Sequence, residues 1–250
     1  MNSSANKCSV SKWMGAGTAI NKLCPPLYRQ INRFRKLRLH EPDVHLPHRV
    51  LGTFYGGWAI PQDYLNQESI AYTVGVGRDI SFDLALVKEF GCKVFAFDPT
   101  PIAVQFMAER KQPDGITFVP VGLSACDGTR TFFAPQIKEF DCFSKVIDTT
   151  AGVSAEIKCE TLTFASLMKS LGHDFIDLLK MDIEGFEYEV LIEMISSRAL
   201  PRCLLVEFHH LTYGISIEET CKAVASLSAV GYRIFWVSQL GREYGFILSN

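Results

Sequence analysis

Glycines and an acidic residue occur in this sequence at a spacing that suits binding of a nucleoside. Gly75-Val-Gly77 follows a buried apolar run, and glycine lets the backbone approach a ligand without a clash from Cβ. Asp98 follows after about 20 residues, the offset at which an acid can hydrogen-bond ribose hydroxyls. Ile80 stands where a third glycine would complete a dinucleotide-binding loop, which counts against a pyrophosphate ligand. The alternative is a tight strand-to-helix turn with no ligand.

A second group of charged residues follows a later apolar run, in Lys180-Met-Asp-Ile-Glu-Gly-Phe-Glu-Tyr-Glu189. Strand alternation places Lys180, Asp182 and Glu184 toward one side, and Gly185 permits a sharp turn into the next helix. A carboxylate at such a strand tip can hold part of a cofactor or accept a proton from a substrate hydroxyl. Acids also favour helix N-termini, so simple capping of the next helix is the competing interpretation.

A third group, Glu207-Phe-His209-His210, ends another apolar run. Either histidine could be a general base, because the pKa of imidazole lies near working pH. Asp182, Glu207 and a histidine could also form an oxygen-and-imidazole metal site. No spacing in the sequence fixes that geometry, so we assign no metal ligands.

Alternating strands and helices must position these residues. Apolar runs predict strands over 70–76, 93–97, 116–121, 175–181, 203–208, 232–237 and 244–248, and helical segments stand between most of them. We expect Asp79 or Ser81 to cap a helix that runs through Phe90 and ends at Gly91. A second helix is expected to begin at Pro101. This pattern predicts an α/β fold with a mostly parallel sheet that is covered on both faces. Residues 122–160 are expected to be an insertion with short strands at 129–133 and 156–160.

The last two strands discriminate between classes of Rossmann-like protein. Only a short polar turn separates residues 232–237 from 244–248, and so short a link forces an antiparallel pair. A nicotinamide-dependent oxidoreductase is expected to have a wholly parallel sheet, whereas a C-terminal antiparallel hairpin is typical of S-adenosylmethionine-dependent methyltransferases. The sequence therefore favours the methyltransferase class.

Composition and charge limit the kinds of partner and the cellular compartment that we expect. The chain has 250 residues, 25 Lys and Arg against 27 Asp and Glu, and a net charge of -2, which argues against nucleic acid as a partner. Eight dispersed cysteines without a C-x-x-C pair suggest a reducing compartment, and no apolar stretch is long enough to span a membrane. We therefore expect a soluble, cytoplasmic protein.

The N-terminal region differs from the rest. Residues 1–24 have little periodicity, residues 28–39 form a basic amphipathic helix candidate, and residues 40–48 are an irregular linker with two prolines. We expect a tail and basic helix over 1–48 and one catalytic domain over 49–250. The basic helix is interpreted as a solvated cap of the domain, with weak contact to an anionic surface as the alternative.

Three segments resemble the FkbM family of methyltransferases. They are Leu51-Gly-Thr-Phe-Tyr-Gly-Gly-Trp-Ala-Ile-Pro61, Phe97-Asp-Pro-Thr-Pro101, and Leu179-Lys-Met-Asp-Ile-Glu-Gly-Phe-Glu-Tyr-Glu-Val-Leu191, the most recognisable of the three. Leu204-Leu-Val-Glu-Phe-His209 fits the strand that follows. The resemblance runs from about residue 49 to residue 248.

The resemblance implies a Rossmann-like class I methyltransferase fold, S-adenosylmethionine as methyl donor, and transfer to a hydroxyl of a sugar or small natural product. By position, Gly75 and Gly77 would pass under the cofactor, Asp98 with the adjoining Pro99 would bind its ribose, and Leu123-Ser124 would flank adenine. Asp182 and Glu184 would line the edge where the methyl group is transferred.

We predict that the general base is His209 or Asp182. Tyr55 and Trp58 are interpreted either as an aromatic lid over the cofactor or as core residues. A catalytically inactive binding module that keeps this fold is the second hypothesis, because the glycine loop is incomplete. A nicotinamide-dependent oxidoreductase is the third.

Overall fold

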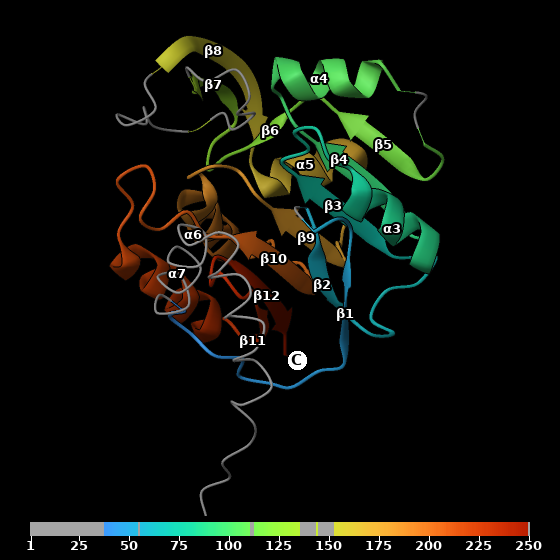
Figure 1. Cartoon of the computed structure of the whole chain (residues 1–250), viewed down its shortest axis with the longest axis vertical. Coiled ribbons are helices and arrows are strands. Elements are labelled where there is room, and N and C mark those ends of the chain that lie inside the picture. Colours follow the sequence, from blue (N-terminus) through green and yellow to red (C-terminus); the bar gives the residue numbers. More distant parts are fainter. Residues whose placement is uncertain (1–37, 55, 111–112, 136–143, 145–152, 250) are drawn as a thin grey trace, which may run out of the picture.

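The computed structural model describes residues 38–54, 56–110, 113–135, 144 and 153–249. Its main sheet contains β3 (Ile70–Val74), β4 (Lys93–Phe97), β5 (Ile116–Val119), β9 (Leu178–Met181), β10 (Cys203–Glu207), β11 (Tyr232–Val237) and β12 (Glu243–Leu248). In space these strands follow the order β5-β4-β3-β9-β10-β12-β11 (Figure 1). The order reverses between β3 and β9, so the edge beyond these two strands is the switch point at which open α/β sheets bind ligands.

One strand of this sheet runs against the others. The pairs β3 with β4, β4 with β5, β3 with β9 and β9 with β10 are parallel. β12 is antiparallel to both β10 and β11, between which it lies. The predicted α/β fold is confirmed, with its mostly parallel sheet and its antiparallel C-terminal pair.

Within the described residues, five helices connect the strands. They are α3 (Ser81–Phe90), α4 (Pro101–Ala108), α5 (Phe164–Leu171), α6 (Glu187–Ser197) and α7 (Ile217–Ala229). Gly91 ends α3 in the left-handed conformation, and Thr100 caps α4 ahead of Pro101. The predicted cap of α3 by Asp79 or Ser81 was wrong, because Ile80 is the N-cap and makes no side-chain cap hydrogen bond. Asp79 instead accepts a hydrogen bond from the backbone N–H of Ser81, the first residue of the helix.

The core lies on both faces of the sheet. Side chains from α5, α6 and α7, among them Phe164, Leu191 and Leu227, pack with one face. Side chains from α3 and α4, among them Leu86 and Met107, pack with the other face. The central strands are buried on both sides, which explains why they appear as continuous apolar runs.

Two smaller sheets complete the fold. β1 (His48–Leu51) and β2 (Trp58–Pro61) form an antiparallel hairpin whose second strand is buried with α3 and α4. β6 (Gly122–Leu123), β7 (Gly128–Pro135) and β8 (Val153–Leu162) form a three-stranded sheet beside α4 (Figure 1). The short strands expected at 129–133 and 156–160 are therefore confirmed as parts of β7 and β8, while the β1–β2 hairpin had no counterpart among the predicted elements.

The expected basic helix over 28–39 falls almost entirely outside the described residues, as does the tail over 1–24. Arg38 and Leu39, which are described, are not helical. Residues 40–47 are irregular as predicted, and Asp43 hydrogen-bonds Ile234 on β11. In the described part of the chain, no helix has both the length and the apolar character that crossing a membrane requires.

Candidate functional site

The loop after β3 contains both predicted glycines, and each meets a different steric requirement. Gly75 has a φ of +89°, and a Cβ built there would lie 1.9 Å from the carbonyl oxygen of Asp182. Gly75 is thus required for the contact between the tips of β3 and β9. Gly77 has a φ of +52°, and a Cβ built there meets nothing within 4 Å. The space above Gly77 is therefore open.

Asp98 supports this loop from the tip of β4. Its Oδ2 accepts hydrogen bonds from the backbone N–H groups of Val76 and Gly77 at 3.0 and 2.9 Å. Its Oδ1 accepts two more, from the backbone and hydroxyl of Thr100 at 2.9 and 2.6 Å. A carboxylate has about four lone-pair positions. The buried Asp98 side chain therefore holds both the loop and the start of α4, and its contact with a ribose stays a prediction.

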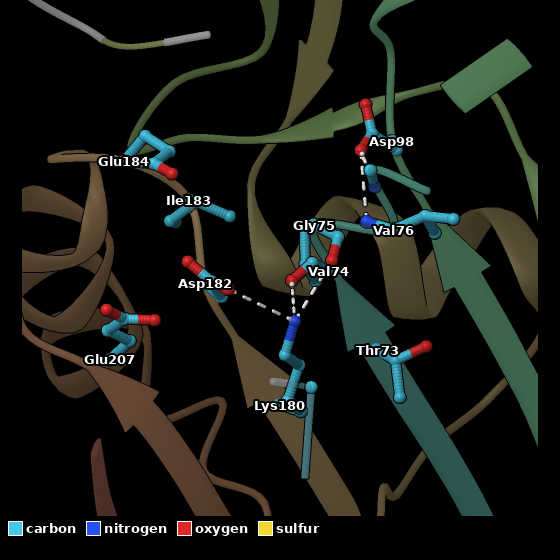
Figure 2. A network of polar contacts seen from close by, with 12 residues as sticks. Thr73, Val74, Gly75, Val76, Asp98, Lys180, Asp182, Ile183, Glu184 and Glu207 are labelled. Carbon is cyan, nitrogen blue, oxygen red and sulfur yellow. Dashed lines mark hydrogen bonds and ion pairs between the residues drawn. The ribbon is translucent and has the colours of Figure 1, made fainter. Parts of the chain in front are cut away.

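Lys180 joins β9 to the same loop. Its Nζ donates to the carbonyl oxygen of Gly75 at 3.0 Å and lies 3.7 Å from Oδ2 of Asp182 (Figure 2). The backbone N–H of Asp182 donates to the carbonyl oxygen of Val74 at 3.1 Å. Figure 2 shows Asp182, Glu184 and Glu207 on one side of the loop and Asp98 on the other. The loop is thus fixed from both sides.

The turn after β9 is held by a buried carboxylate. Glu187, the first residue of α6, is fully buried, and its carboxylate accepts hydrogen bonds from the backbone N–H groups of Ile183 and Gly185. Glu184 adopts a φ of +52°, which is unfavourable for a residue with a side chain. Tyr213, which also has a positive φ, donates its hydroxyl to Oε2 of Glu184 at 2.6 Å. Backbone strain therefore collects at this edge.

His209 lies between carboxylates at the end of β10. Its Nδ1 is 2.8 Å from Oε1 of Glu187, and its Nε2 is 3.1 Å from Oε2 of Glu184. Burial disfavours the charged imidazolium, but Glu187 and Glu184 outweigh it and hold the pKa of His209 well above its usual value. The two carboxylates therefore favour the protonated form of His209.

Asp182 directly follows β9, and Glu207 is the last residue of its parallel neighbour β10. Their carboxylates lie close together beside His209. Burial raises the pKa of the Asp182 carboxyl, while Lys180 and His209 oppose the rise. Burial, together with Asp182, raises the pKa of Glu207 to about 8, against the effect of His209 and Arg242. Both carboxyl groups therefore exchange protons closer to neutral pH than ordinary acids, which suits proton transfer.

The residues predicted to flank adenine are packed inside the structure. Leu123 and Ser124 are both buried, and the Ser124 hydroxyl hydrogen-bonds the carbonyl oxygen of Cys126 at 2.7 Å and Oγ1 of Thr161 at 3.0 Å. Pro99 beside Asp98 is partly exposed. The structure thus brings together Asp182, Glu184, Glu207 and His209 near Gly75, but it does not bring Leu123 or Ser124 to an open surface.

The segment between β1 and β2 lies over the start of α3. The Thr53 hydroxyl donates to Oδ2 of Asp79 at 2.7 Å. Asp79 lies two residues after Gly77. Trp58 is buried, with Nζ of Lys180 5.6 Å from its ring centre. Trp58 is therefore core rather than a free aromatic lid, and Tyr55 lies outside the described residues.

The sequence patterns did not identify two residues of the site, Glu187 and Tyr213. Glu187 was taken only as part of the following helix, although it orders both the turn and His209. Tyr213 follows β10 and reaches back to Glu184. The second acid of the Glu184-Gly-Phe-Glu187 pattern is a usable signal for Glu187, whereas no local pattern marks Tyr213.

Comparisons with known proteins identify the family of this chain. The family model for the methyltransferase FkbM domain matches residues 69–234. Among solved structures, the chain is similar to a crystal structure of methyltransferase FkbM from Methylobacillus flagellatus KT, with 13% sequence identity and a TM-score of 0.46. That similarity covers 73% of this chain and 44% of the other, so this chain spans less than half of that protein's length. No curated protein gives a significant match.

Proposed function

The chain belongs to the FkbM methyltransferase family, and we propose that it transfers a methyl group from S-adenosylmethionine to a hydroxyl oxygen of a sugar or another small molecule. The observation that carries the choice of cofactor is the open space above Gly77, at the edge where strand order reverses. A backbone bend without side chains suits close approach of a nucleoside. The antiparallel β12 argues against the nicotinamide-dependent alternative.

Gly75, Gly77, Asp98 and Pro99 are the residues that we propose to hold the cofactor. Asp98 acts through the loop: it fixes the N–H groups of Val76 and Gly77, so the bend keeps its shape when the ligand arrives. The contribution of Leu123 and Ser124 to an adenine pocket stays a prediction, and their burial means that a neighbouring segment must move to admit the base.

Bound S-adenosylmethionine supplies a methyl group on an electrophilic sulfonium. The protein must hold the acceptor oxygen in line with that carbon at about 3–3.5 Å and receive the proton that the hydroxyl loses. We propose Asp182 as the group that receives it, since its carboxyl is partly exposed at the edge and has a raised pKa. Glu184 and His209 position this edge through their ion pair, and the charged His209 stabilises nearby anionic groups.

Native mass spectrometry tests the proposal. The intact protein is mixed with S-adenosylhomocysteine, the demethylated product, or with NADH at the same concentration. We expect one S-adenosylhomocysteine per chain and no retained NADH. Retention of NADH alone would support the oxidoreductase, and retention of neither ligand by folded protein would support the inactive binding module.

A further inference from the structure

Three potential metal ligands meet at the edge beside the glycine loop. Asp182 directly follows β9, Glu207 is the last residue of the parallel neighbour β10, and His209 lies two residues beyond it. One ligand atom from each lies within 4.8 Å of the other two. Nε2 of His209 is 3.9 Å from Oδ1 of Asp182 and 3.9 Å from Oε1 of Glu207. None of the three side chains is on the open surface: His209 is buried, and Asp182 and Glu207 are partly buried.

The two carboxylates have unused acceptor capacity. Among the described residues, no hydrogen bond reaches the carboxylate of Asp182 or of Glu207, and their printed contacts are ion pairs. Lys180 approaches Asp182 at 3.7 Å through the other oxygen, and Arg242 approaches Glu207 at 3.7 Å. Partly buried carboxylates normally accept close hydrogen bonds, whereas these two have only ion pairs of 3.7–3.9 Å, so each keeps an oxygen that could bind a cation.

The histidine is oriented as metal-bound histidines are. Nδ1 of His209 lies 2.8 Å from the fully buried carboxylate of Glu187, which is itself fixed by the backbone N–H groups of Ile183 and Gly185. A carboxylate on one ring nitrogen fixes the tautomer and turns the other nitrogen toward a metal. Here that other nitrogen, Nε2, lies 3.1 Å from Oε2 of Glu184 and 3.9 Å from both Asp182 and Glu207, so a bound cation would take the place of its contact with Glu184.

Local charge favours a doubly charged ion. The cluster contains four carboxylates, from Asp182, Glu184, Glu187 and Glu207, and its permanent cations are Lys180 and Arg242. A bound divalent cation would replace the proton on Nε2 of His209 and hold all four carboxyl groups in their ionised form. In that state the four carboxylates and two permanent cations carry an excess of two negative charges, which one divalent cation balances. Two carboxylates and an imidazole suit a cation of the Mn²⁺ type, with the remaining positions taken by water or substrate oxygen.

We propose that Asp182, Glu207 and Nε2 of His209 form a binding site for a divalent cation, with Glu187 fixing the histidine. The site goes beyond the proposed methyl transfer and does not depend on it. In an enzyme of this kind the cation would also bind and acidify an acceptor oxygen at the same edge.

Titration of the metal-free protein with Mn²⁺, followed by electron paramagnetic resonance of the free ion, tests this site. We expect one saturable site per chain, and affinity at least tenfold weaker in Asp182→Asn and in Glu207→Gln. Glu218→Gln is the matched control, because Glu218 is an exposed carboxylate on α7 that pairs with Lys222. Its binding should equal that of the unmodified chain.

The proposal is overturned if the unmodified folded chain shows no saturable site, if both cluster variants bind as tightly as it does, or if Glu218→Gln weakens binding equally. A measurement without substitution guards against variants that unfold. Mn²⁺ should broaden the NMR signals of the His209 ring before those of the exposed His48, and equal broadening of both would also overturn the site.

Titration of the same metal-free samples with S-adenosylhomocysteine separates this proposal from the proposed function. Binding of Mn²⁺ without S-adenosylhomocysteine would leave the cation site standing and reject the methyltransferase. Binding of S-adenosylhomocysteine without Mn²⁺ would do the reverse.

Discussion

Asp98 illustrates how one residue type can serve a site in two ways. An acid at this position was expected to contact the ribose, because its spacing from the glycine loop matches that use. In the structure its carboxylate instead accepts hydrogen bonds from Val76, Gly77 and Thr100. The spacing predicted where the acid lies but not its rotamer, because the donors around it come from the folded loop.

Replacing Asp98 with alanine should therefore damage the loop and the cofactor site together. The substitution leaves the N–H groups of Val76 and Gly77 without their acceptor, at a cost of about 2–4 kcal/mol in the free energy of unfolding. We expect affinity for S-adenosylhomocysteine to fall more than tenfold. Calorimetric binding and urea denaturation measure the two effects, and unchanged affinity would show that the loop does not contact the cofactor.

The two glycines of the loop should respond differently to alanine. Gly75→Ala places a methyl group against the carbonyl oxygen of Asp182 and should destabilise the fold by about 3 kcal/mol or more. Gly77→Ala has open space and should cost about 1–2 kcal/mol for its left-handed backbone. Its methyl group projects where we place the cofactor, so affinity for S-adenosylhomocysteine should fall at least tenfold.

Gly172 provides the control for Gly77. It ends α5 with a φ of +70°, and a Cβ there also meets nothing within 4 Å. Gly172→Ala should therefore lose similar stability but keep its affinity for S-adenosylhomocysteine. Equal affinity in Gly77→Ala and Gly172→Ala would place the cofactor elsewhere.

At the scale of elements, α3 is tied to the central strand by a buried acid. Asp83 on α3 accepts a hydrogen bond from the hydroxyl of Thr73 on β3. Burial raises the pKa of Asp83 and Asp79 adds to the rise, while Thr73 and Lys180 oppose it. The folded chain therefore keeps this proton to a higher pH than the unfolded chain does.

This shift predicts a pH-dependent effect of Asp83→Asn. In the natural chain the contribution of Asp83 to stability is complete below the unfolded pKa of about 3.9, and it is lost as pH rises through the folded pKa. Asparagine keeps an acceptor for Thr73 but does not titrate. The stability of Asp83→Asn relative to the natural chain should thus be higher at pH 8 than at pH 5, measured by urea denaturation. A difference that is constant with pH would contradict the shift.

The elements themselves were largely predictable, and the reasons are physical. Central strands such as β9 and β10 are buried on both faces and therefore appear as continuous apolar runs. Helix ends were marked by local signals such as Gly91 and Pro101. The β1–β2 hairpin had no such signal, since its burial comes from distant helices rather than from an alternating pattern.

The position of the site could be predicted from the sequence, but the contacts between its side chains could not. Asp182, Glu184 and His209 follow neighbouring parallel strands, so their meeting at one edge follows from topology. The ion pairs of His209 with Glu184 and Glu187 depend on the turn geometry, which sequence spacing does not determine. The carboxylate contacts that favour a protonated His209 are therefore a result of packing, and its role as base stays a prediction.

For the whole molecule, strand order carries the functional argument. β12 inserts between β10 and β11 and runs against both, an order that the short polar turn alone could not specify. The result places β3 and β9 at the centre of the sheet, with the glycine loop and the acidic cluster on one edge. A nucleoside bound there would lie next to groups that can accept a proton.

Isothermal titration of the purified chain with S-adenosylhomocysteine tests this account most directly. We predict saturable binding of one equivalent, together with stabilisation of the fold that grows with ligand concentration, because the ligand binds only the folded chain. Absence of saturable heat at millimolar ligand, with the protein shown to be folded, would contradict the account.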